Sequence, residues 1–169
     1  MGALMIPDIK KILYATDLSA NARHAFTYAV SVAHQYGAGI TILHVLEDLS
    51  QSISSHMAVY LIGDQWEEMK KRNLEEVLKK VQTRLDKFHE DMSGELASHP
   101  FTVDDIRVKV GIPVEEILRQ AKEGDFDLVV MGTHGHGVMA EAVIGSTARR
   151  VVRWCKKPVL VVHLPEGDD

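Results

Sequence analysis

Short apolar runs alternate with stretches of helical periodicity along the whole chain. Five runs predict β-strands, at residues 10–16, 39–45, 102–110, 127–131 and 158–163. The runs at 39–45 and 127–131 are almost continuously apolar, which indicates strands covered on both faces, as in a parallel sheet. The run at 102–110 alternates apolar and polar residues instead, so we expect it near the edge of the sheet.

The intervals between the first three strands predict two helices. Ser19 stands where its side chain can cap a helix that Gly37 ends in a left-handed conformation. A longer, charged helix is predicted from Trp66 to about Leu96, with a solvated face of Glu and Lys. Its expected buried stripe consists of Leu74, Val77, Leu78, Val81, Leu85 and Phe88.

Two further helices are predicted between the later strands. Pro113 suits the first position of a helix that Gly124 ends. The last helix is expected from about Gly145 to Cys155. Strands that alternate with helices predict a three-layer, doubly wound α/β fold with a parallel sheet. We expect residues 1–169 to form one domain.

The stretch from 47 to 64 fits neither period. It is interpreted as a long loop with some packing of its own, a lid or a partner contact. Within it the apolar patch from Met57 to Ile62 is a candidate contact surface.

Composition narrows the class of protein. A net charge of -5 argues against binding to duplex nucleic acid. No apolar run approaches the length of a membrane span, and the first residues do not resemble a secretory signal. Cys155 is the single cysteine, so no intrachain disulfide can form. We expect a cytoplasmic protein in which Cys155 is a half-buried residue at a helix end, in preference to a reactive thiol.

The segment between the fourth strand and the last helix carries the candidate chemistry. Gly132, Gly135, Gly137 and Gly145 let backbone N–H groups approach an anion closely. A helix N-terminus then adds unpaired N–H donors and partial positive charge. Ser146 and Thr147 follow at once and can donate to phosphate oxygens, although plain helix capping by either hydroxyl is the competing interpretation.

Two better-known phosphate motifs do not fit this segment. A P-loop needs a lysine where the helix opens, and none lies between Gly132 and Thr147. The loose dinucleotide pattern from Gly135 to Ala140 sits in the last crossover and has no acidic residue about 20 positions later. The segment is therefore predicted to hold phosphates in another way.

The spacing of Gly132, Gly135, Gly145 and Ser146 resembles the ATP-binding pattern of the universal stress protein family. Four other segments resemble the family in the right order. They are KILYATDLS at 11–19, LHV at 43–45, GIPVEEIL at 111–118 and KPVLVV at 157–162. The resemblance implies strand order 3-2-1-4-5, as in adenine nucleotide alpha hydrolase-like folds. In that order Asp17 and Gly132 lie side by side at the switch point of the sheet.

The resemblance also implies a site for ATP, with ADP or AMP as alternatives. Val45 is expected to contact adenine through its backbone, and the segment from Ala15 to Asp17 to lie against the nucleoside and phosphates. A turn or helix-capping carboxylate is the competing interpretation of Asp17. The phosphates are expected near the last helix, with Mg²⁺ held mainly by the phosphates and by no dedicated protein site. The implied binding residues are Ala15, Thr16, Asp17, Val45, Met131, Gly132, Gly135, His136, Gly145, Ser146 and Thr147.

No catalytic residue is predicted. His134 and His136 fit exposed loop residues, phosphate contacts or a metal pair, and Arg149 and Arg150 fit surface charges better than an arginine finger. Phosphoryl transfer normally uses a positioned cation and a water-orienting group. We therefore expect slow turnover or none, in a stress-response module that an unidentified signalling partner reads.

Two other functions remain open at this point. They are an ATPase or adenylyl-transferring enzyme completed by a partner, and an adaptor without nucleotide. The resemblance further implies a homodimer paired through the last strand, 158–163, an apolar run expected at a sheet edge.

Overall fold

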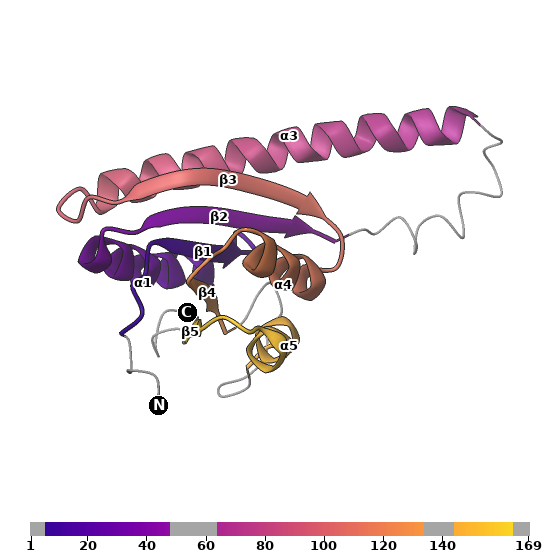
Figure 1. The fold of residues 1–169 in the computed structure, drawn as a ribbon. Helices are drawn as coiled ribbons and strands as arrows, with labels where there is room; N and C mark the ends of the chain where they lie inside the picture. Colours follow the sequence, from indigo (N-terminus) through magenta and orange to yellow (C-terminus); the bar gives the residue numbers. More distant parts are fainter. Residues whose placement is uncertain (1–5, 48–63, 134–143, 164–169) are drawn as a thin grey trace.

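The computed structural model describes residues 6–47, 64–133 and 144–163. It contains five strands and four helices within these ranges (Figure 1). In chain order they are β1 (Lys11–Thr16), α1 (Ala20–Tyr36), β2 (Gly39–Leu46), α3 (Asp64–Glu95), β3 (Thr102–Val110), α4 (Pro113–Glu123), β4 (Leu128–Gly132), α5 (Ser146–Trp154) and β5 (Val159–Val162).

All five strands are parallel and follow the order β3-β2-β1-β4-β5, as predicted. β1 is therefore central, with β2 on one side and β4 on the other. The chain moves from β1 toward β3 in its first half and crosses to β4 and β5 in its second. The carboxyl ends of β1 and β4 consequently form the switch point, where open sheets of this kind bind ligands.

Helices cover both faces of the sheet, which confirms the three-layer prediction (Figure 1). Alternate residues of β1 serve the two faces, because successive side chains of a strand point in opposite directions. Ile12 and Tyr14 pack with α1 and α3, whereas Leu13 and Ala15 pack with α4 and α5. The continuous apolar character of the central strands thus reflects burial on two sides.

The predicted helix ends are confirmed in part. Gly37 ends α1 with φ of 64°, in the left-handed region that favours glycine. Ser19 occupies the N-cap position of α1, but its side chain makes no capping hydrogen bond, so the capping prediction is wrong. Cys155 is half-buried at the end of α5, as expected.

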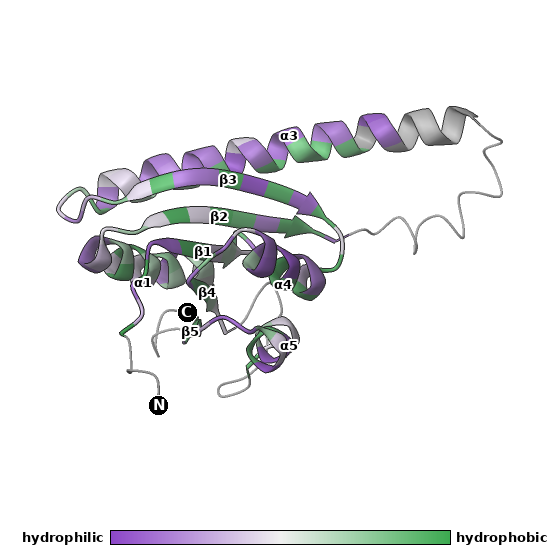
Figure 2. Cartoon of the chain, in the orientation of Figure 1, coloured by the Kyte–Doolittle hydropathy of each residue, from purple (hydrophilic) through white to green (hydrophobic). Residues whose placement is uncertain are grey.

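The buried stripe predicted for α3 is only half correct. Val81, Leu85 and Phe88 are buried, whereas Leu74 and Val77 are 40% and 39% exposed. A helix of 32 residues spans about 48 Å, but the nine residues of β3 span only about 30 Å. α3 therefore continues past the sheet, and its first turns have no strand beneath them (Figures 1 and 2).

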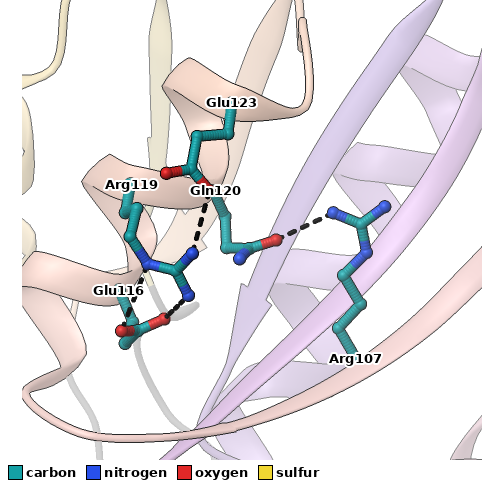
Figure 3. A network of polar contacts seen from close by, with 5 residues as sticks. All are labelled: Arg107, Glu116, Arg119, Gln120 and Glu123. Carbon is teal, nitrogen blue, oxygen red and sulfur yellow. Dashed lines mark hydrogen bonds and ion pairs between the residues drawn. The ribbon is translucent and has the colours of Figure 1, made fainter.

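α4 is attached to the edge of the sheet through a buried amide. Gln120 is 5% exposed, and its Oε1 accepts a hydrogen bond of 2.8 Å from Arg107 Nη1 on β3 (Figure 3). On the outer side of α4, Arg119 bridges Glu116 and Glu123. The helix is thus fixed against β3 at its core side and carries a paired charge cluster at its surface.

The remaining differences are shifts of one or two residues. β1 begins at Lys11, β2 reaches Leu46, β4 runs from Leu128 into Gly132, and β5 is limited to Val159–Val162. α3 runs from Asp64 to Glu95, and α5 from Ser146 to Trp154.

The patch from Met57 to Ile62 lies outside the described residues. No helix in the described part of the chain is long and apolar enough to cross a bilayer.

Candidate functional site

The register of the central strands brings two distant segments together. Ala15 pairs with Met131 across β1 and β4, and both side chains are buried. Asp17 follows Ala15 by two residues, and Gly132 directly follows Met131. Asp17 and Gly132 therefore leave the sheet side by side at its carboxyl edge, as the predicted strand order requires.

A second link brings the start of α5 to the same place. The backbone N–H of Gly145 donates to the carbonyl oxygen of Thr133 at 2.8 Å. Thr133, only 2% exposed, in turn donates its N–H to Val162 of β5 at 3.0 Å. The two ends of the glycine segment are thus joined directly, and the N-cap of α5 stands at the end of β4.

The turn after β1 is held by its own side chains. Thr16 Oγ1 accepts from the backbone N–H of Leu18, and Asp17 Oδ1 accepts from the N–H of Ser19, both at 3.0 Å. Leu18 has a φ of 63°, a left-handed conformation that is unfavourable for a residue with a branched side chain. The structure thus places the Asp17 carboxylate in a turn, where it binds the backbone leading into α1.

The N-termini of α1 and α5 differ from that of α4. Neither α1 nor α5 has an acidic residue in its first turn, and neither receives a side-chain capping bond from its N-cap residue. α4 has Glu115 and Glu116 in its first turn. Because a helix N-terminus carries partial positive charge, α5 can offer that charge to an outside anion, whereas α4 has carboxylates of its own and the Asp17 carboxylate already lies at the start of α1.

The predicted binding residues differ in accessibility. Ala15, Thr16 and Met131 are buried, so they can meet a ligand mainly through their backbone. Five predicted residues are half-buried and Ser146 is exposed, so these six are accessible from outside the sheet. The half-buried ones besides Asp17 are Val45, Gly132, Gly145 and Thr147. Gly135, His136 and the neighbouring His134 lie outside the described residues.

The described residues offer little for metal binding. They contain no group of three or more His, Cys, Asp or Glu side chains that could hold an ion. At the switch point the carboxylate of Asp17 is the acidic group that the register brings next to β4. Arg149 and Arg150 are exposed on α5, in agreement with their interpretation as surface charges.

Two residues at this edge were not anticipated. His44, which pairs with Thr16 in the β1–β2 register, places its Nδ1 2.8 Å from the carbonyl oxygen of Thr16. Thr133 closes the glycine segment as described above. The sequence signals were present, since His44 directly precedes Val45 and Thr133 directly follows Gly132.

The opposite edge of the sheet contains a separate groove. Its volume is about 260 Å³, and it is lined by residues that include His34, Gly37, Gly39, Phe101 and Asp104. These residues lie at the end of α1 and at the starts of β2 and β3. The groove is therefore distinct from the carboxyl edge at which the predicted residues gather.

Comparison with known proteins agrees with this arrangement. Residues 8–163 match the model of the universal stress protein family. The universal stress protein MJ0577 of Methanocaldococcus jannaschii is 31% identical over 157 residues, which cover 90% of this chain and 94% of that protein.

Solved structures show the same fold. A structure of MJ0577 superposes with a TM-score of 0.70 at 31% identity, covering 95% of this chain and 100% of that one. UspA from Lactobacillus plantarum gives a TM-score of 0.70 at 25% identity, with coverage of 93% and 99%. A universal stress protein from Archaeoglobus fulgidus, solved in complex with dAMP, gives 0.57 at 18% identity, with coverage of 92% and 98%. The family match over nearly the whole sequence, together with the shared strand order, shows that this chain belongs to the universal stress protein family.

Proposed function

We propose that this chain binds an adenine nucleotide, with ATP as the cellular ligand, at the carboxyl edge of β1 and β4. One observation carries the proposal. The bond from Gly145 to Thr133 sets the N-terminus of α5 at the switch point, beside the segment that follows β1. Three features then meet at the carboxyl edge of β1 and β4: the end of a strand, glycine backbone, and a helix N-terminus without an acidic residue in its first turn. This is the usual arrangement for binding phosphate in open α/β sheets.

The roles of the residues follow from their positions. The phosphates would lie at Gly132, Gly145, Ser146 and Thr147, where backbone N–H groups and two hydroxyls can donate. Gly135 and His136 complete the phosphate-binding set of the proposal. The nucleoside would lie toward β1 and β2.

On the nucleoside side, Ala15, Thr16 and Met131 form the floor. The backbone of Val45 would meet the adenine base, and the carboxylate of Asp17 would accept from ribose hydroxyls. Mg²⁺ would be held mainly by phosphate oxygens. The dAMP complex of the Archaeoglobus relative supports an adenine nucleotide as the ligand class. The choice of ATP over ADP or AMP rests on the resemblance of the spacing of Gly132, Gly135, Gly145 and Ser146 to the ATP-binding pattern of the family.

The proposed role is that of a nucleotide-dependent stress-response module rather than an enzyme. Residues 132–147 contain no lysine. The charge on the phosphates would thus be met by backbone groups, the dipole of α5 and Mg²⁺, without a lysine of the kind that assists phosphoryl transfer in P-loop enzymes. Bound nucleotide would instead alter the surface that a signalling partner reads.

We also propose a homodimer through β5. β5 ends the sheet, and Pro158 and Val162 direct their carbonyl oxygens toward β4. Backbone groups of alternate residues in a parallel strand face the same side. Val159 and Val161 therefore direct their N–H and C=O groups to the open edge, where a second copy can pair with them.

The identity of the ligand is tested by denaturing freshly purified protein and analysing the released small molecules by mass spectrometry and ultraviolet absorbance. The proposal predicts an adenine nucleotide near one equivalent, or its uptake by protein purified empty. Protein that releases none and binds neither ATP, ADP nor AMP at millimolar concentration would be an adaptor without nucleotide.

A further inference from the structure

The turn that links β1 to α1 has a single defined shape in spite of its strain. Leu18 holds a φ of 63°, a left-handed conformation that costs free energy in a residue with a side chain. Two local bonds offset part of that cost, from Leu18 N–H to Thr16 Oγ1 and from Ser19 N–H to Asp17 Oδ1. Both bonds depend on how the peptide between Thr16 and Asp17 is oriented.

That peptide is held from outside the turn by His44. The Nδ1 atom of His44, on β2, lies 2.8 Å from the carbonyl oxygen of Thr16. A carbonyl oxygen can only accept, so Nδ1 carries the hydrogen and donates it. The neutral Nδ1–H tautomer and the imidazolium both meet this requirement, whereas the neutral Nε2–H tautomer does not.

The bond reaches Asp17 through covalent geometry. The carbonyl of Thr16 and the N–H of Asp17 belong to one planar peptide, so fixing the oxygen fixes the direction in which Asp17 leaves β1. Thr16 is 7% exposed, and His44 is half-buried in the adjacent strand, so both partners are themselves held by packing. A hydrogen bond between two such constrained groups fixes the orientation of the Thr16 carbonyl more firmly than a bond from a mobile surface side chain would.

We propose that His44 is a positioning residue for the nucleotide site. Its Nδ1–H holds the last peptide of β1 and thereby sets the turn that presents Asp17 to the nucleoside. The part of this inference that concerns ligand affinity rests on the proposed function, while the part that concerns the turn does not. His44 acts through Thr16 and Asp17.

Two substitutions separate the hydrogen bond from the volume of the side chain. His44→Asn keeps an N–H donor close to the place of Nδ1, whereas His44→Leu fills similar space without a donor. His34→Leu is the matched control, because His34 Nδ1 also lies near a backbone carbonyl, that of Pro100 at 3.3 Å, but at the opposite edge of the sheet. Thermal unfolding of each variant confirms that it folds.

Amide hydrogen exchange of Leu18 and Ser19 reports the turn without any ligand. We expect His44→Leu to accelerate exchange at both amides about tenfold, the loss of one hydrogen bond to the turn, with Val130 in β4 unchanged. His44→Asn and His34→Leu should exchange like the wild type. Unchanged exchange in His44→Leu, or equal acceleration in His44→Asn, would overturn the inference.

Calorimetric titration with ATP reports the effect on the site. The dissociation constant should rise about tenfold in His44→Leu and stay near the wild-type value in the other two variants. Faster exchange with unchanged ATP affinity would refute the link to the nucleotide. If the wild type binds no adenine nucleotide, the proposed function fails, and the exchange experiment still decides whether His44 sets the turn.

The tautomer of His44 can also be measured in the wild-type protein, so this test does not depend on whether the variants fold. The ¹⁵N chemical shifts of neutral His44 should be those of the Nδ1–H tautomer, in which Nδ1 carries the proton and Nε2 does not. The opposite tautomer would refute the proposal by itself.

Discussion

The backbone N–H of Gly145 donates to the carbonyl oxygen of Thr133 at 2.8 Å, so the helix N-cap and the strand end are direct neighbours. This contact fixes the two ends of the glycine segment against each other. Glycine at 145 has no side chain beside the first turn of α5, which suits close approach of an anion to the backbone. The helix dipole then points at the switch point of the sheet.

Turnover of ATP should be slow. The segment at 132–147 has no lysine, so purified protein with Mg²⁺ should release phosphate at well below about 1 per second, the lower end of the range for dedicated enzymes. A coupled phosphate assay at saturating ATP measures this rate. Faster release that survives repeated purification would favour the ATPase or adenylyl-transferring function instead.

The proposed dimer depends on backbone groups at the open edge of β5. Val161→Pro removes an N–H that faces away from β4, so it should weaken pairing between copies while sparing the sheet itself. Val161→Thr keeps that N–H and nearly the same shape. Light scattering at micromolar concentration should give a dimer for the wild type and Val161→Thr, and a monomer for Val161→Pro. A monomeric mass for the wild type would contradict the proposed dimer.

Two leucines of α3 should differ in their contribution to stability. Leu85 is fully buried, so Leu85→Ala should lower the free energy of unfolding by about 2–5 kcal/mol. Leu74 is 40% exposed where α3 has passed the sheet, so Leu74→Ala should cost less than about 1 kcal/mol. Urea unfolding followed by circular dichroism measures both. Equal losses would mean that the first turns of α3 are covered in solution.

Asp127 should make stability depend on pH at the amino edge of the sheet. Its Oδ2 accepts from the backbone N–H groups of Lys10 and Lys11 at 2.8 and 2.9 Å. Partial desolvation raises the pKa of Asp127, but these two bonds and the nearby charges of Lys157 and Lys11 outweigh it, so the pKa is lowered overall. The carboxylate therefore stabilises the fold above the pKa of the unfolded chain, and the gain disappears as the pH falls through the lowered value.

The substitution that tests this is Asp127→Asn. It should lower the free energy of unfolding by about 1–2 kcal/mol near neutral pH, as expected for hydrogen bonds to a charged group. The difference from the wild type should shrink below pH ~4, near the ordinary pKa of an aspartate. Asp125→Asn is the control for charge, because Asp125 is exposed and Asn also tolerates its φ of 52°. A loss that is independent of pH would contradict the proposed role of the carboxylate.

The sequence predicted the sheet well because strand and helix periods are local. Each strand shifted by no more than two residues, and the resemblance implied the order of all five. The exposure of Leu74 and Val77 could not be read from periodicity, since a helical stripe carries no information about where the sheet beneath it ends. The failure of Ser19 as a cap could not be read from the sequence either, because the N–H of Ala22, which the Ser19 hydroxyl could have bound, donates to the backbone carbonyl of Ser19 instead.

At the candidate site the sequence predicted which residues bind the nucleotide, whereas the contacts between those residues became clear only from the structure. The adjacency of Asp17 and Gly132 followed from strand order, so it was predictable. The contacts of His44 with Thr16 and of Gly145 with Thr133 were not. The first depends on the register of β1 and β2, and the second on how the chain returns to the end of β4 before α5, and only the fold defines these.

Equilibrium binding of ATP to the Gly145→Val variant tests nucleotide binding at this edge most directly. Gly145 has φ of −56° and ψ of 157°, values that valine can adopt, so the substitution adds bulk at the phosphate site without straining the backbone. Gly94→Val, at a helix position with open space around it, is the control. We predict that the dissociation constant of Gly145→Val rises at least about tenfold while Gly94→Val matches the wild type. Equal affinity in all three proteins would show that ATP does not bind at the N-terminus of α5.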